Sequence, residues 1–184
     1  MRLLSLDGAS VCLRPVGYEF GQPPGGAAEG DADDWYADWL MIRGDASTAD
    51  GQAWTFTDPC LSTGEAADLS AWLWAAASQD LPAGFNSDEM FTEPNLHFTL
   101  DAHDGERVRV RVRFSHESLP TWLPGNGPRW RDGAGYSLRL RMSRADLAEA
   151  ARAWDRDCQQ FPPRVPAPGA RSVARHERFT RPWK

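Results

Sequence analysis

The chain has 184 residues, of which 41% are hydrophobic and 25% are charged, close to the averages of globular proteins. This length fits one domain, and a mean hydropathy of −0.54 excludes a membrane-embedded protein.

The net charge of −6 conceals an uneven distribution of charge along the chain. Residues 1–106 hold 3 basic and 19 acidic residues, a net charge of −16, whereas residues 107–184 hold 17 basic and 7 acidic residues, a net charge of +10. The two halves can form opposite faces or neutralise each other across the fold.

Targeting signals and cysteine spacing point to one compartment. Asp7 interrupts the N-terminal apolar stretch, which is too short for a secretory signal. The three cysteines, Cys12, Cys60 and Cys158, are widely spaced and odd in number, so they do not form a disulfide pattern. We therefore expect a cytoplasmic protein, with no membrane as a partner.

Two hairpins are expected in the first third of the chain. Apolar residues alternate on both sides of Asp7-Gly8, a dipeptide favoured in tight hairpin turns, and predict an opening hairpin. Residues 21–30 are rich in Gly and Pro and predict a loop. Residues 35–43 and 52–57 are rich in aromatic residues and predict a second hairpin, with its turn at Asp50-Gly51.

A helix is expected after this hairpin. Asp58-Pro59 is expected to end the preceding strand, because proline cannot donate a hydrogen bond to a strand ladder. Ser62 stands three residues before Glu65, which is the spacing of a capping box. Apolar residues then recur at helical spacing until Pro82, so we predict a helix in this segment.

The second half of the chain predicts further strands. Short strands are expected at 89–91 and 96–100, on either side of Pro94. In residues 107–114 arginines alternate strictly with apolar residues (three valines and Phe114), so one face of a strand belongs to the core and the other carries guanidinium groups. Residues 136–142 repeat this pattern, and we expect these two strands to pair.

A second helix and a tail complete the predicted elements. Ser143 and Asp146 form a weaker capping signal for a helix that is expected to end near Phe161. Residues 162–184 are basic and contain five prolines, which predicts a tail without regular structure. We thus expect a single domain over residues 1–161 and a basic, Pro-rich C-terminal tail over residues 162–184.

The predicted fold class is α+β. We expect a largely antiparallel sheet of about seven or eight strands with two helices, the first helix following the fourth strand. The helices are expected to cover one face of that sheet.

Few residue patterns indicate chemistry. The four histidines and three cysteines lack the spacings of zinc sites, and the glycines fit no phosphate or dinucleotide motif, so we expect no metal and no cofactor. Cys60 precedes a predicted helix N-terminus, whose dipole would favour a reactive thiolate, but no base is placed beside it by a motif. A buried cysteine at a strand–helix corner is the favoured interpretation.

The Arg107 to Arg113 strand is the best candidate for nucleic-acid binding, because a flat basic face can contact phosphates. Aromatic residues for base stacking are not interleaved with these arginines. We favour instead a solvent-facing strand whose arginines are partnered by acids from the acidic half of the chain. Nucleic acid remains the alternative partner.

Several short motifs together resemble one family of proteins. They are Asp38-Trp39-Leu40, residues 54–61 (WTFTDPCL), residues 91–96 (FTEPNL), residues 114–117 (FSHE) and residues 120–122 (PTW). These stretches resemble the WapI-type immunity proteins, small cytoplasmic bacterial proteins of polymorphic toxin systems, over roughly residues 11–161. The resemblance implies a non-catalytic partner that neutralises a cognate toxin domain by binding it. It provides no toxin-contacting residues, and the sequence does not set the oligomeric state.

A binding surface for such a toxin is predicted in the acidic half. Many toxin domains act on nucleic acids and are basic, so an acidic patch would steer their approach and two aromatic residues would anchor them. The residues we expect to form this surface are Asp31, Asp33, Asp34, Trp35, Tyr36 and Asp38. The competing interpretations of the whole chain are a nucleic-acid-binding module that uses the Arg107 to Arg113 face and a small enzyme that uses Cys60.

Overall fold

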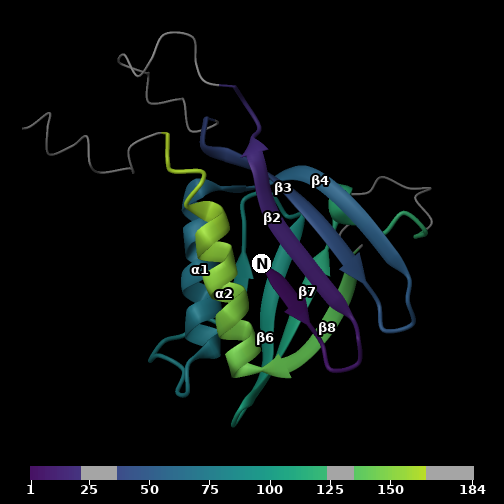
Figure 1. Cartoon of the computed structure of the whole chain (residues 1–184), viewed down its shortest axis with the longest axis vertical. Coiled ribbons are helices and arrows are strands. Elements are labelled where there is room, and N and C mark those ends of the chain that lie inside the picture. Colours follow the sequence, from purple (N-terminus) through teal and green to yellow (C-terminus); the bar gives the residue numbers. More distant parts are fainter. Residues whose placement is uncertain (22–36, 124–134, 165–184) are drawn as a thin grey trace, which may run out of the picture.

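The computed structural model describes residues 1–21, 37–123 and 135–164. The described residues form two helices and eight strands, which pair antiparallel in two four-stranded sheets (Figure 1). The α+β fold expected from the sequence is thus confirmed, with the strands divided between two sheets. The first sheet has the order β1 (Arg2–Leu4), β2 (Ser10–Tyr18), β3 (Trp39–Ser47), β4 (Ala53–Ser62). The second has the order β5 (Asp88–Met90), β6 (Leu96–Asp104), β7 (Arg107–Phe114), β8 (Tyr136–Ser143).

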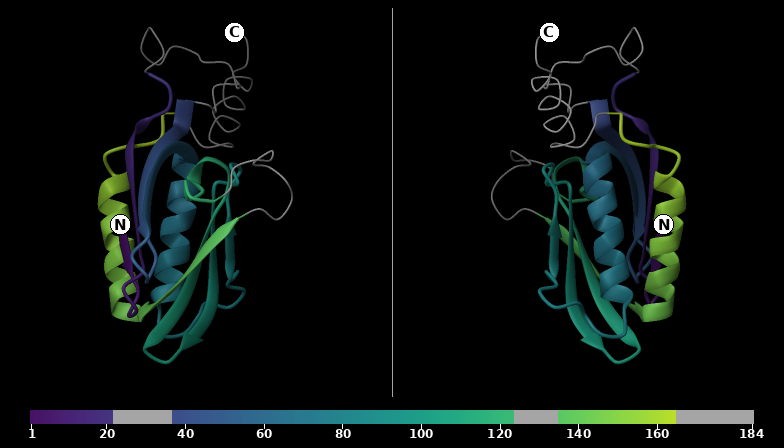
Figure 2. Two further views of the ribbon diagram at one scale, coloured as in Figure 1. Left: turned by 90° about the vertical axis from the view of Figure 1, so that its right-hand side faces the viewer. Right: turned by 90° about the vertical axis from the view of Figure 1, so that its left-hand side faces the viewer.

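The helices α1 (Thr63–Ala77) and α2 (Arg144–Cys158) pack side by side along one side of the two sheets. In the side views the sheets form separate layers, with α1 between their planes and α2 beside the first sheet (Figure 2). The indole N–H of Trp154 donates to the carbonyl of Ala66 at 2.8 Å and joins the two helices. The helices therefore close the space between two sheets. The expectation that they cover one face of a single sheet is wrong.

Both predicted hairpins are present. The β1–β2 turn places Gly8 at φ +94°, and the β3–β4 turn places Gly51 at φ +89°. These left-handed conformations explain the glycines, since residues with a side chain rarely adopt them. Most of the expected loop at 21–30 and the first residues of the expected strand 35–43 lie outside the described residues.

The strand β4 does not end at Asp58-Pro59, contrary to the prediction. It continues to Ser62, and Pro59 pairs with Met41 of β3 next to a bulge. Because β4 is the outer strand of its sheet, a proline here costs no ladder hydrogen bond on the open side. The chain therefore passes from β4 into α1 without a connecting loop.

Capping boxes begin both helices, as predicted. The backbone N–H of Glu65 donates to Ser62 at 3.2 Å, and the Glu65 carboxylate accepts from the N–H of Ser62 at 2.8 Å. Ser143 and Asp146 form the equivalent pair at the start of α2. The second helix ends at Cys158, before Phe161. None of the described helices is long and apolar enough to cross a membrane.

One hydrophobic cluster fills the space between the sheets and the helices. On β7 the valines are buried and Arg107 and Arg109 are exposed, so the predicted alternation and the predicted pairing with β8 are confirmed. Trp54 of β4 contacts the rings of Phe114 and Tyr136 from the second sheet, with centroids 5.0 and 5.6 Å apart. These contacts join the start of β4 to the end of β7 and the start of β8.

Candidate functional site

Three of the sequence motifs meet at one junction in the fold. The end of β4 supplies the DPCL residues, the segment before β6 supplies FTEPNL, and the turn after β7 supplies FSHE together with a short 3₁₀ helix, η2 (His116–Ser118). Asn95 lies at the centre of this junction and is only 2% exposed. We call it the motif junction, comprising residues 58–61, 91–96 and 114–118.

Asn95 holds the three segments together by hydrogen bonds. Its side-chain amide donates to the carboxylate of Asp58. Its backbone carbonyl accepts from the N–H of Ser115 at 3.0 Å and from the hydroxyl of Ser118 at 2.5 Å. The indole N–H of Trp54 donates to the carbonyl of Ser118 at 2.9 Å and links the junction to the first sheet. Because these polar groups are buried, each bond also satisfies a group that would be costly to leave unpaired.

Glu65 connects the junction to the first helix. One oxygen of its carboxylate closes the capping box, and the other accepts from the backbone N–H of Thr92 at 2.7 Å. Thr92 belongs to the FTEPNL segment. A capping residue therefore also fixes the position of a motif segment that is distant in the sequence.

The junction is acidic. Burial raises the pKa of the Asp58 carboxyl, and the nearby charges of Glu117 and Glu93 raise it further, while the hydrogen bond from Asn95 opposes the shift. His116 adopts a φ of +54°, the single non-glycine residue of the described chain at positive φ. Glu117 is exposed in η2, next to the buried Ser118.

Cys60 is also part of this junction and does not have the properties of a nucleophile. Its side chain is fully buried, and burial raises the pKa of its thiol to about 12, so that it is protonated at neutral pH. We had considered that the dipole of α1 could favour a thiolate. The desolvation of the charged form outweighs that effect, and the thiol instead packs 3.9 Å from the Asn95 amide.

The residues predicted to contact a partner are only partly described. Asp31, Asp33, Asp34, Trp35 and Tyr36 lie outside the described residues. Asp38 precedes β3, and its carboxylate accepts a hydrogen bond from the backbone N–H of Arg164 at 2.5 Å. The Arg164 guanidinium lies over the ring of Tyr18, 3.4 Å from its centroid. The partner of Asp38 in this hydrogen bond is thus the backbone of Arg164, while the Arg164 guanidinium contacts Tyr18.

The arginines of β7 are not partnered by acids to the extent we expected. Asp101 is 3.0 Å from the Arg111 guanidinium and 3.7 Å from that of Arg139 on β8. Within the described parts of the chain, neither Arg107, Arg109 nor Arg113 forms an ion pair. The same described parts contain no group of three or more His, Cys, Asp or Glu side chains that could hold a metal ion.

The sequence alone does not indicate the central role of Asn95 or the contact between Glu65 and Thr92. The sequence predicts only a helix cap at Glu65 and two short strands on either side of Pro94. The available signal was the motif pattern itself, since an asparagine between a proline and a strand is unusual as a core residue. Hydrophobic periodicity could not have revealed this role, because the hydrogen bonds of Asn95 join segments 20 to 37 residues apart.

The structure therefore defines an antiparallel α+β protein whose motif residues build a buried, acidic junction rather than an open cavity with reactive groups. The model of the Immunity protein WapI-like family matches residues 2–162. The chain belongs to this family, as its motifs indicated. Comparisons with curated proteins and with solved structures give no match.

Proposed function

We propose that this protein is an immunity protein that neutralises a cognate bacterial toxin domain by direct binding in the cytoplasm, with no turnover of its own. The observation that carries the proposal is the family match over residues 2–162, which includes every described helix and strand. A buried hydrogen-bonded junction suits a binding protein, since it fixes the surface turns above it in one conformation.

We place the toxin-binding surface on the acidic residues near the start of β3. These are Asp31, Asp33, Asp34, Trp35, Tyr36 and Asp38. Acidic side chains would increase the association rate of a basic toxin domain, and the two aromatic side chains would provide contact area that excludes water.

The first experiment asks whether neutralisation occurs. A candidate toxin domain, chosen from the genes that neighbour the gene of this protein, is expressed alone and together with the protein, and growth is measured. We expect the protein to restore growth and to form a stable complex with the purified toxin domain. Restored growth without a complex would contradict neutralisation by direct binding.

The second experiment asks where the toxin binds. Charge reversal of Asp31, Asp33 and Asp34 should slow association with the toxin domain and reduce its dependence on salt, while leaving the fold intact. Reversal of Asp68, Asp80 and Glu106 is the matched control, since these acids are exposed and change the net charge equally. Both triple variants could associate with the toxin domain at the rate of the parent and restore growth equally well. The toxin-binding surface would then lie elsewhere, and the proposed neutralising function would still hold.

A further inference from the structure

The outer face of the second sheet carries six arginines. Arg107, Arg109, Arg111 and Arg113 extend from β7, and Arg139 and Arg141 extend from β8. We call this surface the arginine face. The opposite face of the same strands belongs to the core, so the arginines cannot turn inward.

The register of the strands places like charges opposite each other. Arg109 pairs with Arg141, and Arg111 pairs with Arg139. Two like charges directly opposite each other on neighbouring strands are destabilising. The protein therefore retains two cross-strand pairs that cost stability when no anion lies between them.

An acid of the protein compensates one of the two pairs. The ladder between β6 and β7 shifts its register between Leu100 and Ala102, and Asp101 lies at that irregularity. Its carboxylate contacts Arg111 at 3.0 Å and Arg139 at 3.7 Å, and its side chain is only 19% exposed. One carboxylate thus serves both arginines of a cross-strand pair.

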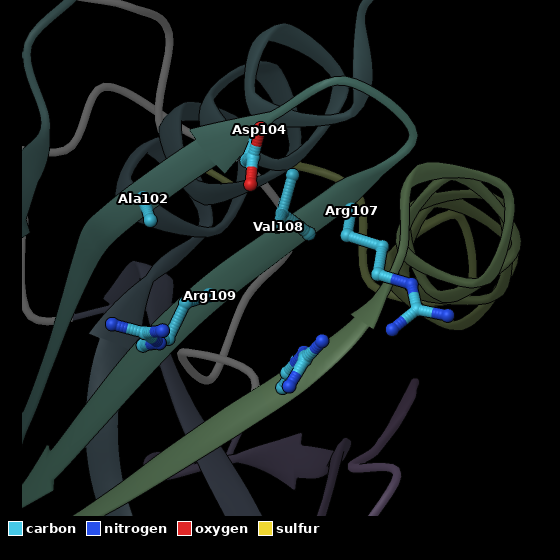
Figure 3. Close-up of a pocket in the computed structure, with 6 residues that line it drawn as sticks. Ala102, Asp104, Arg107, Val108 and Arg109 are labelled. Atoms are coloured by element: carbon cyan, nitrogen blue, oxygen red, sulfur yellow. The ribbon is translucent and has the colours of Figure 1, made fainter.

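The neighbouring pair has no such acid. Ala102 of β6 stands opposite Arg109, and it has no polar side chain to offer. Ala102, Asp104, Arg107, Val108, Arg109 and Arg141 line a shallow hollow of about 190 Å³ at this point (Figure 3). In the part of the chain that the structure describes, no carboxylate forms an ion pair with Arg109 or Arg141, and Asp104 lines the hollow without pairing with either of them.

We propose that the hollow between Arg109 and Arg141 binds a carboxylate side chain of an acidic protein partner, in the way that Asp101 serves the adjacent arginine pair. Guanidinium groups recognise planar carboxylates by charge-assisted hydrogen bonds, and here two of them are held by a rigid sheet. The arginine face comprises other residues than those assigned to toxin binding, so the inference goes beyond the proposed function and does not depend on it.

Two observations favour an acidic protein over a nucleic acid. The aromatic residues of β6, β7 and β8, namely Phe98, Phe114 and Tyr136, pack in or against the core and offer no ring for base stacking on the arginine face. The whole chain also has a net charge of −6, which opposes the approach of a long polyanion more than that of a compact acidic segment.

The first test is a titration of the isotopically labelled full-length protein with a short oligoglutamate peptide, followed by nuclear magnetic resonance. We expect the backbone signals of Ala102, Arg109 and Arg141 to shift most. The double variant Arg109→Gln, Arg141→Gln should weaken binding about tenfold or more, because it removes two charged partners of the carboxylate. The control is Arg152→Gln, Arg156→Gln, which removes two exposed arginines from α2 and should bind like the parent.

The second test supplies the missing acid. Ala102→Asp places a carboxylate beside Arg109 and should raise the melting temperature while abolishing the peptide-induced shifts. Ala102→Asn introduces a side chain of nearly the same size as aspartate but without its charge. This variant should neither raise the melting temperature nor abolish the peptide-induced shifts. Because the acidic variant is expected to be more stable than the parent, loss of binding cannot be attributed to unfolding.

Three outcomes would overturn the proposal. The peptide could shift signals away from the hollow, the arginine variant could bind as tightly as the control, or Ala102→Asp could leave binding unchanged. A single-stranded oligonucleotide of the same net charge is titrated in parallel. If it bound more tightly than oligoglutamate and lost its affinity in the arginine variant, the arginine face would be a nucleic-acid surface instead.

Discussion

Asn95 shows how one side chain determines the conformation of three segments. It is buried, its amide donates to Asp58, and its carbonyl accepts from Ser115 and Ser118. This arrangement makes the ionised form of Asp58 unfavourable, because its carboxylate is half-buried and lies near the charges of Glu117 and Glu93. The junction therefore depends on pH.

Replacement of this carboxylate by an amide should stabilise the protein at neutral pH. The pKa of Asp58 is raised above its ordinary value of 3.8 in the folded state, so the folded protein holds the proton at higher pH than the unfolded chain does. Stability therefore falls as the pH rises from the unfolded pKa through the folded pKa. Asp58→Asn removes this loss and can still accept the hydrogen bond from Asn95.

We expect Asp58→Asn to have a higher free energy of unfolding than the parent at neutral pH, with the difference vanishing below the unfolded pKa. Urea unfolding at several pH values measures it. Asp68→Asn, at an exposed position on α1, is the control. A variant that was less stable than the parent at neutral pH would show that the negative charge of Asp58 contributes to the junction.

The cysteines should differ sharply in reactivity. Burial raises the pKa values of the Cys60 and Cys158 thiols to about 12, whereas Cys12 is half-exposed on β2. Because the thiolate is the species that is alkylated, iodoacetamide at neutral pH should modify Cys12 first and Cys60 only after denaturation. Peptide mapping by mass spectrometry measures the order. Rapid labelling of Cys60 in the folded protein would revive the enzyme interpretation.

At the scale of elements, the two helices begin with equivalent capping boxes that have different surroundings. Glu65 at the start of α1 also accepts from Thr92, while Asp146 at the start of α2, within the described residues, bonds only inside its own box. The first helix is thus joined to the motif junction by its cap. The second helix is positioned by Trp154 and the other buried residues of its apolar stripe.

Glu65→Ala should therefore destabilise the protein more than Asp146→Ala. Loss of a capping interaction costs about 0.5–2 kcal/mol, and loss of the Thr92 hydrogen bond adds about 0.5–1.5 kcal/mol. Chemical denaturation of the two variants measures the difference, and Glu65→Gln, which keeps an acceptor, should lie between Glu65→Ala and the parent. Equal losses for both alanine variants would mean that Glu65 acts as a cap alone.

The elements were largely predictable because their signals are local. Turn glycines, capping boxes and the alternation of residues 107–114 each lie within a few residues of one another, and the structure confirms all of them. The errors have long-range causes. The extension of β4 through Pro59 depends on its position at the edge of a sheet, and the ion pairs of Asp101 depend on a register shift that no local pattern reveals.

At the scale of the whole molecule, the two oppositely charged halves of the chain partly neutralise each other. Asp101 of the acidic half pairs with Arg111 and Arg139 of the basic half. The arginine face nevertheless keeps most of its positive charge. A protein with a net charge of −6 thus carries a basic surface, which net charge alone would not have indicated.

The predicted boundary between a domain over residues 1–161 and a tail over 162–184 can be tested by truncation. The carbonyl of Pro162 accepts from the Tyr18 hydroxyl, and Arg164 contacts Asp38 and the Tyr18 ring. The Arg164 guanidinium also donates to the carbonyl of Phe20 at 2.8 Å. These contacts attach the first residues of the predicted tail to the first sheet.

A chain that ends at Arg164 should therefore be more stable than one that ends at Phe161. The longer chain keeps the hydrogen bond to the Asp38 carboxylate, which contributes about 1.5–3 kcal/mol, and the cation–π contact with Tyr18, which contributes about 0.5–1 kcal/mol. Both chains should unfold in one cooperative transition, because one hydrophobic cluster joins the sheets and helices. Thermal unfolding monitored by circular dichroism and by tryptophan fluorescence measures both properties.

In the full-length chain, Arg164→Ala separates the two contributions, since it removes the guanidinium contacts and keeps the backbone N–H that donates to Asp38. Equal stability of the two truncated chains would place the domain boundary at residue 161, and non-coincident transitions would show that residues 1–161 are not a single cooperative unit.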